Sequence, residues 1–396
     1  MRELISWLLV IGADAIAVPT IVFCLEIVAG ILPRHIRQSY DRDFRGRAAV
    51  LVPAHNESSG IVPTLEDIRT QLHAGDLLLV VADNCIDDTA EQARTRGAVV
   101  LERHDATRIG KGYALDFGIK HLEKDPPDFV VMVDADCRLD SGVIDKLISA
   151  SLTTGRPTQA LYLMKAPDAR VNNQIAEFAW RVKNWVRPLG LARLGLPCQL
   201  TGSGMAFPWS VIRTVNLASG WIVEDLKLGL ELALAGHPPL FCPDACVTSQ
   251  FAVSERGADT QRRRWHQGHL VSIIALVPRL LWIATVRRNL NLMALALDVA
   301  VPPLSLLATL LFLILTIASF AAILGIGSAA FFISASCIVG FASAVVCAWR
   351  IYGTEILPSR AILSLPGYIL EKIGIYHQVL SGKMIFNWIR TDREKS

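Results

Sequence analysis

The sequence predicts an α/β domain with a doubly wound, mostly parallel sheet, joined to α-helical transmembrane segments. Short apolar strands alternate with helical segments between Ala48 and Val133, which is the pattern of a parallel sheet. The 61 residues from Asn289 to Trp349 carry one formal charge, Asp298, and are too apolar for a water-soluble domain. The stretch from Asp41 to Gln261 mixes charges with short apolar runs and therefore belongs to a globular domain.

The composition of the 396-residue chain supports this division. Hydrophobic residues make up 52% of the chain and charged residues 19%, against roughly 45–50% and about 25% in ordinary soluble domains. Intrinsic disorder, collagen-like repeats and a small disulfide scaffold are excluded. The net charge of +3 is too small to indicate nucleic-acid binding. The eight cysteines show no CxxC spacing, so we expect reduced thiols.

The N-terminal segment from Leu4 to Leu32 is apolar enough to cross a bilayer, which takes about 20 residues. It is longer than the roughly 7–15-residue core of a signal peptide, and it starts without net positive charge. We therefore expect residues 1–33 to form a transmembrane helix. The basic residues that follow it are Arg34, Arg37, Arg42, Arg45 and Arg47. By the positive-inside rule, the next domain, residues 34–265, lies in the cytoplasm.

The cytoplasmic domain begins with strands and helices in alternation. The expected strands are 48–53, 77–81, 98–101 and 129–133, and the expected helices are 61–72, 87–96 and 112–122. Ligands of such sheets bind at the carboxyl ends of the strands, so polar residues that follow a strand are candidates for a site. Those residues are Asn56, Glu57, Asp83, Asp134 and Asp136.

The long apolar stretch 289–349 is interrupted by glycine and serine at residues 324–328. We expect a two-helix transmembrane hairpin, with spans at about 290–320 and 331–349. The basic tail after Lys383 then lies on the cytoplasmic side. Charges at Glu371 and Lys372 interrupt the apolar segment 362–379, so residues 350–396 are expected to form an interfacial helix and a cytoplasmic tail.

Two further segments interleave aromatic and basic side chains, as helices at a lipid headgroup boundary do. One is 178–187, with Trp180 and Trp185, and the other is 266–288, with Trp282. We expect the second to be an interfacial helix. For the first, an amphipathic helix packed on its own domain is an equal alternative.

Asp134 and Asp136 directly follow an apolar strand, so both carboxylates can reach one divalent cation. Mg²⁺ and Mn²⁺ prefer oxygen ligands and usually share them with the phosphates of a substrate. An acidic loop without a metal is the alternative for this motif taken alone.

Glu224 and Asp225 begin an apolar helical run. Acidic residues stabilise the N-terminus of a helix, which is the structural reading of this pair. The functional reading is a general base that takes a proton from an attacking hydroxyl group. The loop Thr201, Gly202, Ser203 and Gly204 precedes the pair and lets a ligand approach the backbone.

Gln261, Arg264 and Trp265 combine an amide, a planar cation and a large aromatic ring. Arg264 suits a pyrophosphate through charge-assisted hydrogen bonds, and Trp265 offers a stacking face for a sugar ring. A basic membrane-surface patch is the alternative, because three arginines stand in a row. Lys111 lies between two glycines before a helix and suits a phosphate.

The order of these motifs resembles that of the membrane-bound family 2 glycosyltransferases, which include cellulose synthase, hyaluronan synthase and ceramide glucosyltransferase. The motifs are Pro-Ala-His-Asn-Glu, Asp-Asn-Cys-x-Asp-Asp-Thr, Gly-Lys-Gly-x-Ala-Leu, Asp-x-Asp, Thr-Gly-Ser-Gly, Glu-Asp and Gln-x-x-Arg-Trp. They span about Ala48 to Trp265, over half of the chain. Val223 stands where many members have threonine, and His55 stands where many have tyrosine.

The resemblance implies a GT-A domain with a Rossmann-like, mostly parallel sheet, which binds a nucleotide-sugar and a divalent cation, Mg²⁺ or Mn²⁺. The donor-binding residues it implies are Pro53, His55, Glu57, Asp83, Lys111, Asp134, Gln261 and Arg264. Asp136 would bind the metal beside Asp134, and Asp225 would be the general base, next to Glu224. The implied acceptor-binding residues are Thr201, Gly202, Ser203, Gly204 and Trp265.

The resemblance further implies an inverting transfer from a nucleotide-sugar, with a UDP-sugar as the expected donor. Three predicted spans are few for a polymer channel, so we expect a single transfer to a lipid-linked or membrane-embedded acceptor in cell-surface glycan assembly. The expected location is a bacterial inner membrane, with the catalytic domain in the cytoplasm. A processive polysaccharide synthase is the alternative, and a non-catalytic membrane scaffold is a lesser one. A nucleotidyltransferase would share the sheet and Asp-x-Asp but not the later motifs.

Overall fold

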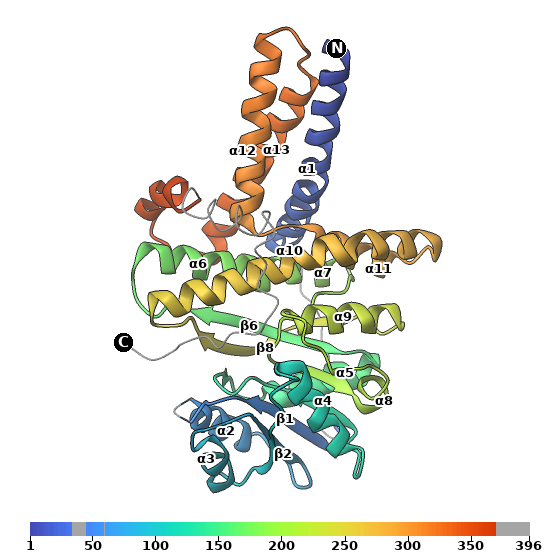
Figure 1. The fold of residues 1–396 in the computed structure, drawn as a ribbon, viewed down its shortest axis with the longest axis vertical. Helices are drawn as coiled ribbons and strands as arrows, with labels where there is room; N and C mark the ends of the chain where they lie inside the picture. Colours follow the sequence, from blue (N-terminus) through green and yellow to red (C-terminus); the bar gives the residue numbers. More distant parts are fainter. Residues whose placement is uncertain (34–44, 59, 370–396) are drawn as a thin grey trace. The chain divides into compact units, whose positions relative to one another are not determined.

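The computed structural model describes residues 1–33, 45–58 and 60–369, which divide into two compact units (Figure 1). The sheet unit contains the described residues of 45–167 and 195–268. The helical unit contains residues 1–33, 168–194 and 269–369. Arg34, Arg37 and Arg42 of the predicted basic cluster lie outside the described residues, as do the basic tail and most of the predicted interfacial segment 362–379.

The sheet unit contains an eight-stranded sheet in the order β3-β2-β1-β4-β7-β6-β8-β5. Its strands are β1 (Ala48–Ala54), β2 (Leu77–Asp83), β3 (Val99–Arg103), β4 (Phe129–Met132), β5 (Arg138–Leu139), β6 (Thr158–Lys165), β7 (Met205–Pro208) and β8 (Leu240–Gln250). Strands β3, β2, β1 and β4 pair in parallel, and so do β6 and β8. Strand β7 runs antiparallel to β4 and β6, and β5 runs antiparallel to β8. The predicted mostly parallel sheet is confirmed, although the pattern did not predict β7 in its middle.

The helices of the sheet unit follow the predicted alternation in its first half. They are α2 (Ile61–Arg69), α3 (Thr89–Thr95), α4 (Lys111–Leu122), α5 (Val143–Thr154), α8 (Trp209–Ile212), α9 (Glu224–Leu234) and the start of α10 (Glu255–Val286). Helix α4 packs its apolar face on strands β1 and β2, where Leu51, Leu79 and Leu115 are almost fully buried. Each such side chain contributes about 1.5–3 kcal/mol of burial free energy. This packing fixes the strand ends on which the site is built.

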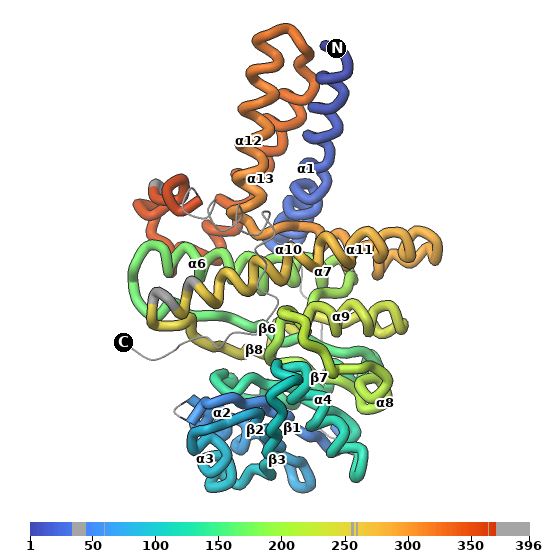
Figure 2. The backbone as a smooth tube through the Cα atoms, viewed as in Figure 1, coloured from blue at the N-terminus to red at the C-terminus, as the bar shows by residue number. Residues whose placement is uncertain are grey.

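The helical unit consists of helices and helical turns in the part of the chain that is described. They are α1 (Arg2–Ile31), α6 (Val171–Arg181), the π-helical turn η1 (Val182–Val186), α7 (Arg187–Arg193), the rest of α10, α11 (Leu290–Ala300), α12 (Leu304–Ile323), α13 (Ala329–Tyr352) and the 3-10 turn η2 (Ser359–Ser364). Helices α1, α12 and α13 lie side by side, as the blue and orange segments show (Figures 1 and 2). Four segments of the described chain are long and apolar enough to cross a membrane, namely Arg2–Ile31, Thr260–Val286, Leu304–Ile323 and Ala329–Tyr352.

The helical unit differs from the predicted hairpin at its first span. The predicted span 290–320 is two helices, because Pro302 and Pro303 lack the N–H that would continue α11 into α12. The predicted interfacial helix 266–288 is the end of α10, which starts at Glu255. The role of this segment, whether interfacial or spanning, stays a prediction.

The aromatic and basic segment 178–187 packs within the helical unit. Its side chains Phe178, Val182 and Val186 are buried, and the ring of Trp185 lies 5.0 Å from that of Tyr352 in an edge contact. This favours the alternative of an amphipathic helix that packs on its own part of the chain.

Candidate active site

Strand β1 pairs with both β2 and β4 in parallel, so the carboxyl ends of these three strands meet at one edge of the sheet. Asn56 and Asn84 follow β1 and β2 with φ of 53° and 51°, a left-handed conformation that asparagine tolerates better than most residues. The Oδ1 atom of Asn56 accepts a hydrogen bond from the Ile86 N–H at 2.8 Å. The Oδ1 atom of Asn84 accepts one from the Asp105 N–H at 2.8 Å. These bonds hold the two strand ends in a defined shape.

A cavity of about 810 Å³ lies at this edge of the sheet. The predicted residues that line it are Pro53, His55, Glu57, Asp83, Lys111, Asp134, Asp136 and Arg264. The structure therefore brings together seven of the eight predicted donor-binding residues and both predicted metal ligands; Gln261 is the residue that does not line the cavity.

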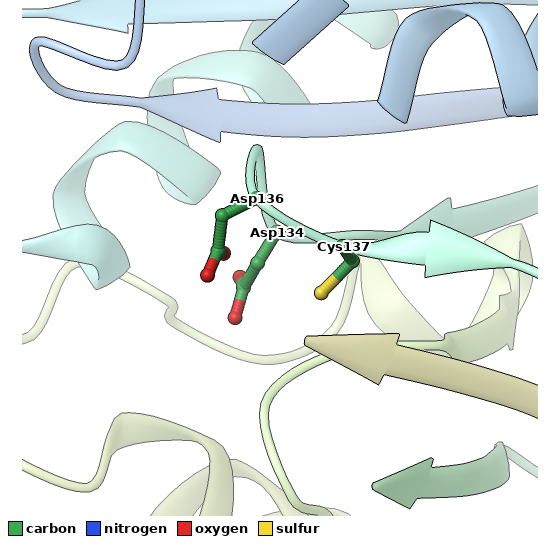
Figure 3. Close-up of side chains that lie close together, drawn as sticks. All are labelled: Asp134, Asp136 and Cys137. Carbon is green, nitrogen blue, oxygen red and sulfur yellow. The ribbon is translucent and has the colours of Figure 1, made fainter. Parts of the chain in front are cut away.

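The Asp-x-Asp turn after β4 groups three possible ligand atoms (Figure 3). One atom each of Asp134, Asp136 and Cys137 lies within 4.8 Å of the others. Burial raises the pKa of the Cys137 thiol well above its usual value, so the sulfur stays protonated, 3.1 Å from the Ser203 hydroxyl oxygen. The Oδ2 atom of Asp136 accepts a hydrogen bond from the Ser249 hydroxyl at 2.6 Å. The two carboxylates, and not the thiol, have the chemistry of a hard-cation site.

Lys111 connects this turn to the Glu-Asp pair. Its ammonium group forms an ion pair with Asp134, lies 3.8 Å from the nearest carboxylate oxygen of Glu224, and donates to the Gly202 carbonyl at 2.7 Å. Its helix, α4, approaches a neighbouring loop so closely that a Cβ at Gly112 would lie 2.6 Å from the Ser219 carbonyl oxygen. A residue larger than glycine would therefore shift the start of the helix that carries Lys111.

The charged groups around Lys111 shift one another's pKa values. Burial lowers the pKa of Lys111, but the carboxylates of Asp134 and Glu224 outweigh this effect and raise it overall. Burial raises the pKa of Asp134, and Lys111 offsets part of the rise. Burial also raises the pKa of Glu224 to about 7, with Lys111 opposing the rise and Asp225 adding to it. Groups with perturbed pKa values that converge at a cavity are typical of functional sites.

The Glu-Asp pair opens α9, as the sequence predicts. A Cβ built at Gly202, which has a φ of 98°, would lie 3.1 Å from Asp225 Oδ2 and 3.6 Å from Lys111 Nζ. Glycine at this position thus lets the backbone of the predicted acceptor loop approach both Asp225 and Lys111. Glu224 and Asp225 also line a small recess against the start of α4.

The predicted acceptor loop, Thr201 to Gly204, is held by a buried amide that the sequence pattern did not indicate. Gln159 of β6 accepts a hydrogen bond from the Thr201 N–H at 2.8 Å and donates to the Ser203 carbonyl at 2.8 Å. The Ser203 hydroxyl accepts from the Asp134 N–H at 3.0 Å. The loop is thereby tied directly to the Asp-x-Asp turn.

Gln261 and Trp265 lie on the first turns of α10 and make other contacts. The amide of Gln261 is buried and turns towards the N–H of Ala252, 3.5 Å away. The ring of Trp265 packs edge-on against Phe251, with 6.2 Å between ring centres. Their donor and acceptor roles remain predictions.

Three residues that belong to none of the sequence motifs help to position the site, namely Arg103, Gln159 and Ser249. Each is a buried polar side chain near the end of a strand and acts on a predicted residue from a distant part of the chain. Their signal in the sequence is weak: one polar residue in or after an apolar strand.

Comparisons with known proteins bear on the family of this chain. A family model described as glycosyltransferase like family 2 matches residues 46–268, more than half of the chain. The low-salt glycan biosynthesis hexosyltransferase Agl6 of Haloferax volcanii is 33% identical over 113 residues, 28% of this chain and 26% of that relative. The chain thus matches about a quarter of the length of this relative. An uncharacterized glycosyltransferase of Mycobacterium tuberculosis is 33% identical over 197 residues, which are 45% of this chain and 83% of the relative.

A solved structure shares the fold over nearly the whole chain. It is the mannosyltransferase PcManGT from Pyrobaculum calidifontis in complex with GDP-Man and Mn²⁺, with a TM-score of 0.54 and 17% identity. The match covers 97% of this chain and 100% of that one. At this identity the likeness establishes the architecture, and the chemistry has to be argued from the residues themselves.

Proposed function

Because the chain belongs to the glycosyltransferase-like family 2 and has the GT-A fold predicted for it, we propose that it moves a hexose from a nucleotide-sugar to a lipid-linked or membrane-embedded acceptor. The observation that carries the proposal is the convergence at Lys111. This lysine contacts the Asp-x-Asp turn, the acceptor loop and the Glu-Asp pair, so the groups for binding the donor and for activating the acceptor adjoin.

The donor would bind in the 810 Å³ cavity. Pro53, His55, Glu57 and Asp83 would bind the nucleoside, for which we propose uridine. Lys111 and Asp134 would lie near the ribose and the phosphates, and Gln261 and Arg264 would hold the pyrophosphate. Arg264 lines the cavity and offers a planar fork of donors suited to a diphosphate.

Asp134 and Asp136 would hold a divalent cation, Mg²⁺ or Mn²⁺. The donor set fits, because two carboxylates converge and the neighbouring thiol of Cys137 stays protonated. The cation, when bound, offsets the negative charge of the donor diphosphate. Ser249 orients Asp136 through its hydrogen bond to Oδ2.

Asp225 would act as the general base. It takes a proton from the acceptor hydroxyl, whose oxygen forms a bond to the anomeric carbon. The bond from that carbon to the diphosphate oxygen breaks, and the nucleoside diphosphate leaves with the electron pair. One displacement of this kind inverts the anomeric configuration. Lys111 and Arg264 stabilise the charge on the leaving diphosphate, a contribution that is often the largest in such sites.

The acceptor would lie beside the loop Thr201, Gly202, Ser203 and Gly204, with Trp265 as a stacking surface. The four segments long and apolar enough to span a membrane support an acceptor that is itself in the bilayer. We propose an integral protein of a bacterial inner membrane, with its catalytic domain in the cytoplasm. Processive synthesis of a polysaccharide is the alternative for the same site.

The base assignment is tested with Asp225→Asn in the full-length protein. The variant is expected to bind the nucleotide-sugar as the wild type does and to lose transfer by at least about a hundredfold, because the amide cannot take the proton. Binding is measured by calorimetry, and transfer is measured by release of the nucleoside diphosphate. Glu231→Gln, a carboxylate change on the same helix, is the matched control and should keep full activity. Near-wild-type turnover by Asp225→Asn would show that another group is the base.

The nature of the acceptor is tested with labelled nucleotide-sugars and polyprenyl-phosphate-linked or lipid acceptors in detergent. Addition of one sugar supports single transfer. A ladder of products supports the polysaccharide synthase. Absence of metal-dependent transfer or hydrolysis over a broad donor panel would revive the non-catalytic scaffold.

A further inference from the structure

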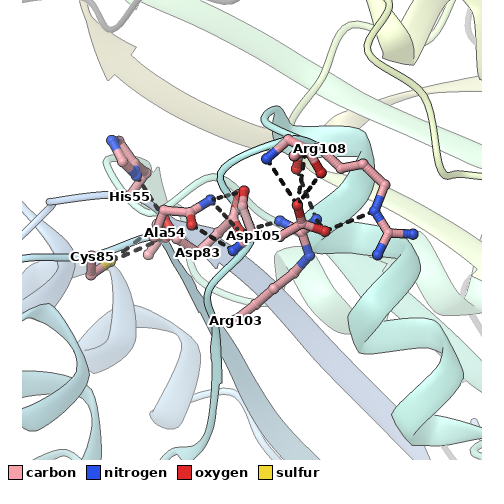
Figure 4. Close-up of polar contacts among 9 residues, drawn as sticks. Ala54, His55, Asp83, Cys85, Arg103, Asp105 and Arg108 are labelled. Carbon is pink, nitrogen blue, oxygen red and sulfur yellow. Dashed lines mark hydrogen bonds and ion pairs between the residues drawn. The ribbon is translucent and has the colours of Figure 1, made fainter.

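Strand β3 ends at Arg103, a buried arginine whose guanidinium is held on several sides (Figure 4). Its Nη1 donates to Oδ1 of Asp83 at 2.5 Å. Its Nη2 donates to the Arg108 carbonyl at 2.8 Å and to Asp105 Oδ2 at 3.2 Å. The ring of Tyr113 lies 5.7 Å from the guanidinium carbon. A planar group with this many fixed partners has little freedom to move.

The two carboxylate oxygens of Asp83 are therefore not equivalent. Oδ1 accepts from Arg103 and also from the side-chain amide of Asn84, at 3.2 Å. Oδ2 accepts no hydrogen bond from the part of the chain that the structure describes. Asp83 is 6% exposed, and it lines the donor cavity. One carboxylate oxygen thus remains for a ligand.

Both ring nitrogens of the neighbouring His55 already have partners, so the imidazole adds no open acceptor beside Asp83. His55 Nδ1 lies 2.6 Å from the Asp83 carbonyl oxygen, and since a carbonyl can only accept, Nδ1 carries the proton. In the neutral ring, Nε2 is then an acceptor; it faces the side-chain amide of Asn56 at 3.5 Å. A base that binds here has to donate hydrogen bonds.

Nucleobases differ in how many donors they present on one edge. Uracil has a single N3–H between two carbonyl groups, and hypoxanthine has a single N1–H. Guanine has an N1–H and an exocyclic amine side by side, an arrangement that needs two acceptor oxygens. Cytosine has a lone pair at N3 and offers no N–H there. A buried donor left without an acceptor weakens binding by roughly tenfold or more.

We propose that Arg103 is a specificity-determining positioning residue. By occupying Oδ1 of Asp83, it leaves one acceptor oxygen for the nucleobase, which selects a uracil nucleotide over a guanine nucleotide. The inference rests on the proposed function, since it takes the base of a nucleotide-sugar to bind at Asp83. Burial raises the pKa of Asp83 and Arg103 lowers it, so the same contact favours the ionised, accepting form.

The experiment measures dissociation constants of UDP, GDP, IDP and CDP by calorimetry, with the full-length protein in detergent and saturating Mn²⁺. The wild type is expected to bind UDP at least about tenfold more tightly than GDP or CDP. It is also expected to bind IDP at least as tightly as GDP, because the extra amine of guanine finds no acceptor. In Arg103→Met, Oδ1 of Asp83 keeps only the longer hydrogen bond from the Asn84 amide, at 3.2 Å, and can accept from a second donor of the base. The affinity for GDP should therefore rise severalfold relative to that for IDP, while UDP binds more weakly.

Arg108→Met is the matched control. The Arg108 side chain is 69% exposed and contacts Asp105 but not Asp83, and the substitution keeps the carbonyl that accepts from Arg103. All four dissociation constants should stay in the wild-type order. If Arg103→Met does not fold, Arg103→Lys serves as the test variant. Lysine keeps the positive charge but lacks the planar guanidinium with its paired donors. It should therefore shift the ratio of the GDP and IDP dissociation constants in the same direction as Arg103→Met.

The outcomes separate the inference from the function on which it rests. The inference is overturned if the wild-type protein binds GDP as tightly as UDP. It is also overturned if neither Arg103 variant changes the ratio of the GDP and IDP dissociation constants. Wild-type protein that binds none of the four nucleotides overturns the proposed donor site itself.

Discussion

At the scale of single residues, the site is organised by one lysine among carboxylates. Lys111 is paired with Asp134 and lies near Glu224, and these two carboxylate side chains are partly buried, at 26% and 18% exposed. Buried charges of one sign are costly unless a partner compensates them. Burial is the main reason why the pKa of Glu224 rises to about 7, and the neighbouring carboxylates add to the rise while Lys111 opposes it.

This raised pKa predicts a pH-dependent stability. The pKa of Glu224 is about 7 in the folded chain against an ordinary 4.5, so the folded state holds a proton that the unfolded state releases. The free energy of unfolding should therefore fall as the pH rises from about 4.5 to about 7, and it should stay constant above that pH. Glu224→Gln should be more stable than the wild type at pH 7.5, by at most about 3 kcal/mol, with a smaller difference at pH 5.5.

The measurement is thermal and denaturant unfolding of metal-free protein in detergent at both pH values. Glu231→Gln, at a more exposed carboxylate of the same helix, serves as the control and should follow the wild-type curve. Parallel curves for the wild type and Glu224→Gln would contradict the shifted pKa.

The sequence predicted the residues of the site better than their contacts. Asp83, Asp134 and Asp136 were predictable, because carboxylates at the ends of parallel strands meet at one edge. The ion pair of Lys111 with Asp134 was not, because the two residues are 23 positions apart in the sequence and no local structure sets their distance. Arg103 and Gln159 could not be assigned, because one buried polar residue in a strand has a partner that only the tertiary fold defines.

At the scale of elements, the helical unit is joined by a buried charge cluster. Arg187 of α7 donates to Glu26 of α1 at 2.5 Å and to the Asp298 carboxylate of α11 at 2.6 Å. All three side chains are about 5% exposed or less. Helices α1 and α7 also approach closely, since a Cβ at Gly190 would lie 2.0 Å from the Glu26 carbonyl oxygen. The cluster thus connects three helices from distant parts of the chain.

Removal of the arginine is expected to destabilise this unit. Arg187→Met leaves two buried carboxylates without their cation, at a cost of about 3–5 kcal/mol. The measurement is the unfolding transition in detergent, followed by tryptophan fluorescence. The triple variant with Glu26→Leu and Asp298→Leu removes the whole cluster and should recover most of the loss, because an apolar replacement has no uncompensated charge. A transition unchanged by Arg187→Met would show that the cluster contributes nothing to stability.

The elements of the first half of the sheet were predictable, because apolar strands and amphipathic helices alternate there with clear boundaries. The second half was not predicted. Strand β7 has four residues and pairs with β4, more than 70 residues earlier in the chain, so its pairing has no local signal. The break between α11 and α12 has a visible cause in Pro302 and Pro303, which the apolar composition around them obscured.

At the scale of the whole molecule, the two units are interleaved along the chain. The helical unit takes three separate segments, and residues 45–167 and 195–268 of the sheet unit lie between them. The sequence predicted, in order along the chain, a transmembrane helix, a soluble-type domain, an interfacial helix, a transmembrane hairpin, and an interfacial helix with a tail. It did not predict that residues 168–194 pack with the apolar helices. That segment is amphipathic, and an amphipathic pattern is compatible with packing in either unit.

A contribution of the apolar hairpin, residues 289–349, to acceptor use can be distinguished from a role in anchoring alone. Deletion of residues 289–349 is expected to leave nucleotide-sugar binding intact and to abolish transfer to a lipid-linked acceptor, if the hairpin contributes to acceptor use. Binding is measured by calorimetry and transfer by labelled product. A variant in which an unrelated transmembrane hairpin replaces these residues is the control and should remain unable to use the lipid acceptor. If that replacement variant transferred sugar to the lipid acceptor as the wild type does, the hairpin would serve only as an anchor.

The interleaved segments also determine the order in which partners become available during synthesis. Helix α1 ends at Ile31, whereas its neighbour α13 starts at Ala329, 298 residues later. At about 5–20 residues per second, a ribosome needs roughly 15–60 s to make the chain between them. Arg187, the partner of Glu26, is 161 residues further along the chain and is synthesised roughly 10–30 s later. Lipid or a chaperone must therefore protect α1, with its exposed leucines and the carboxylate of Glu26, until its partners have been synthesised.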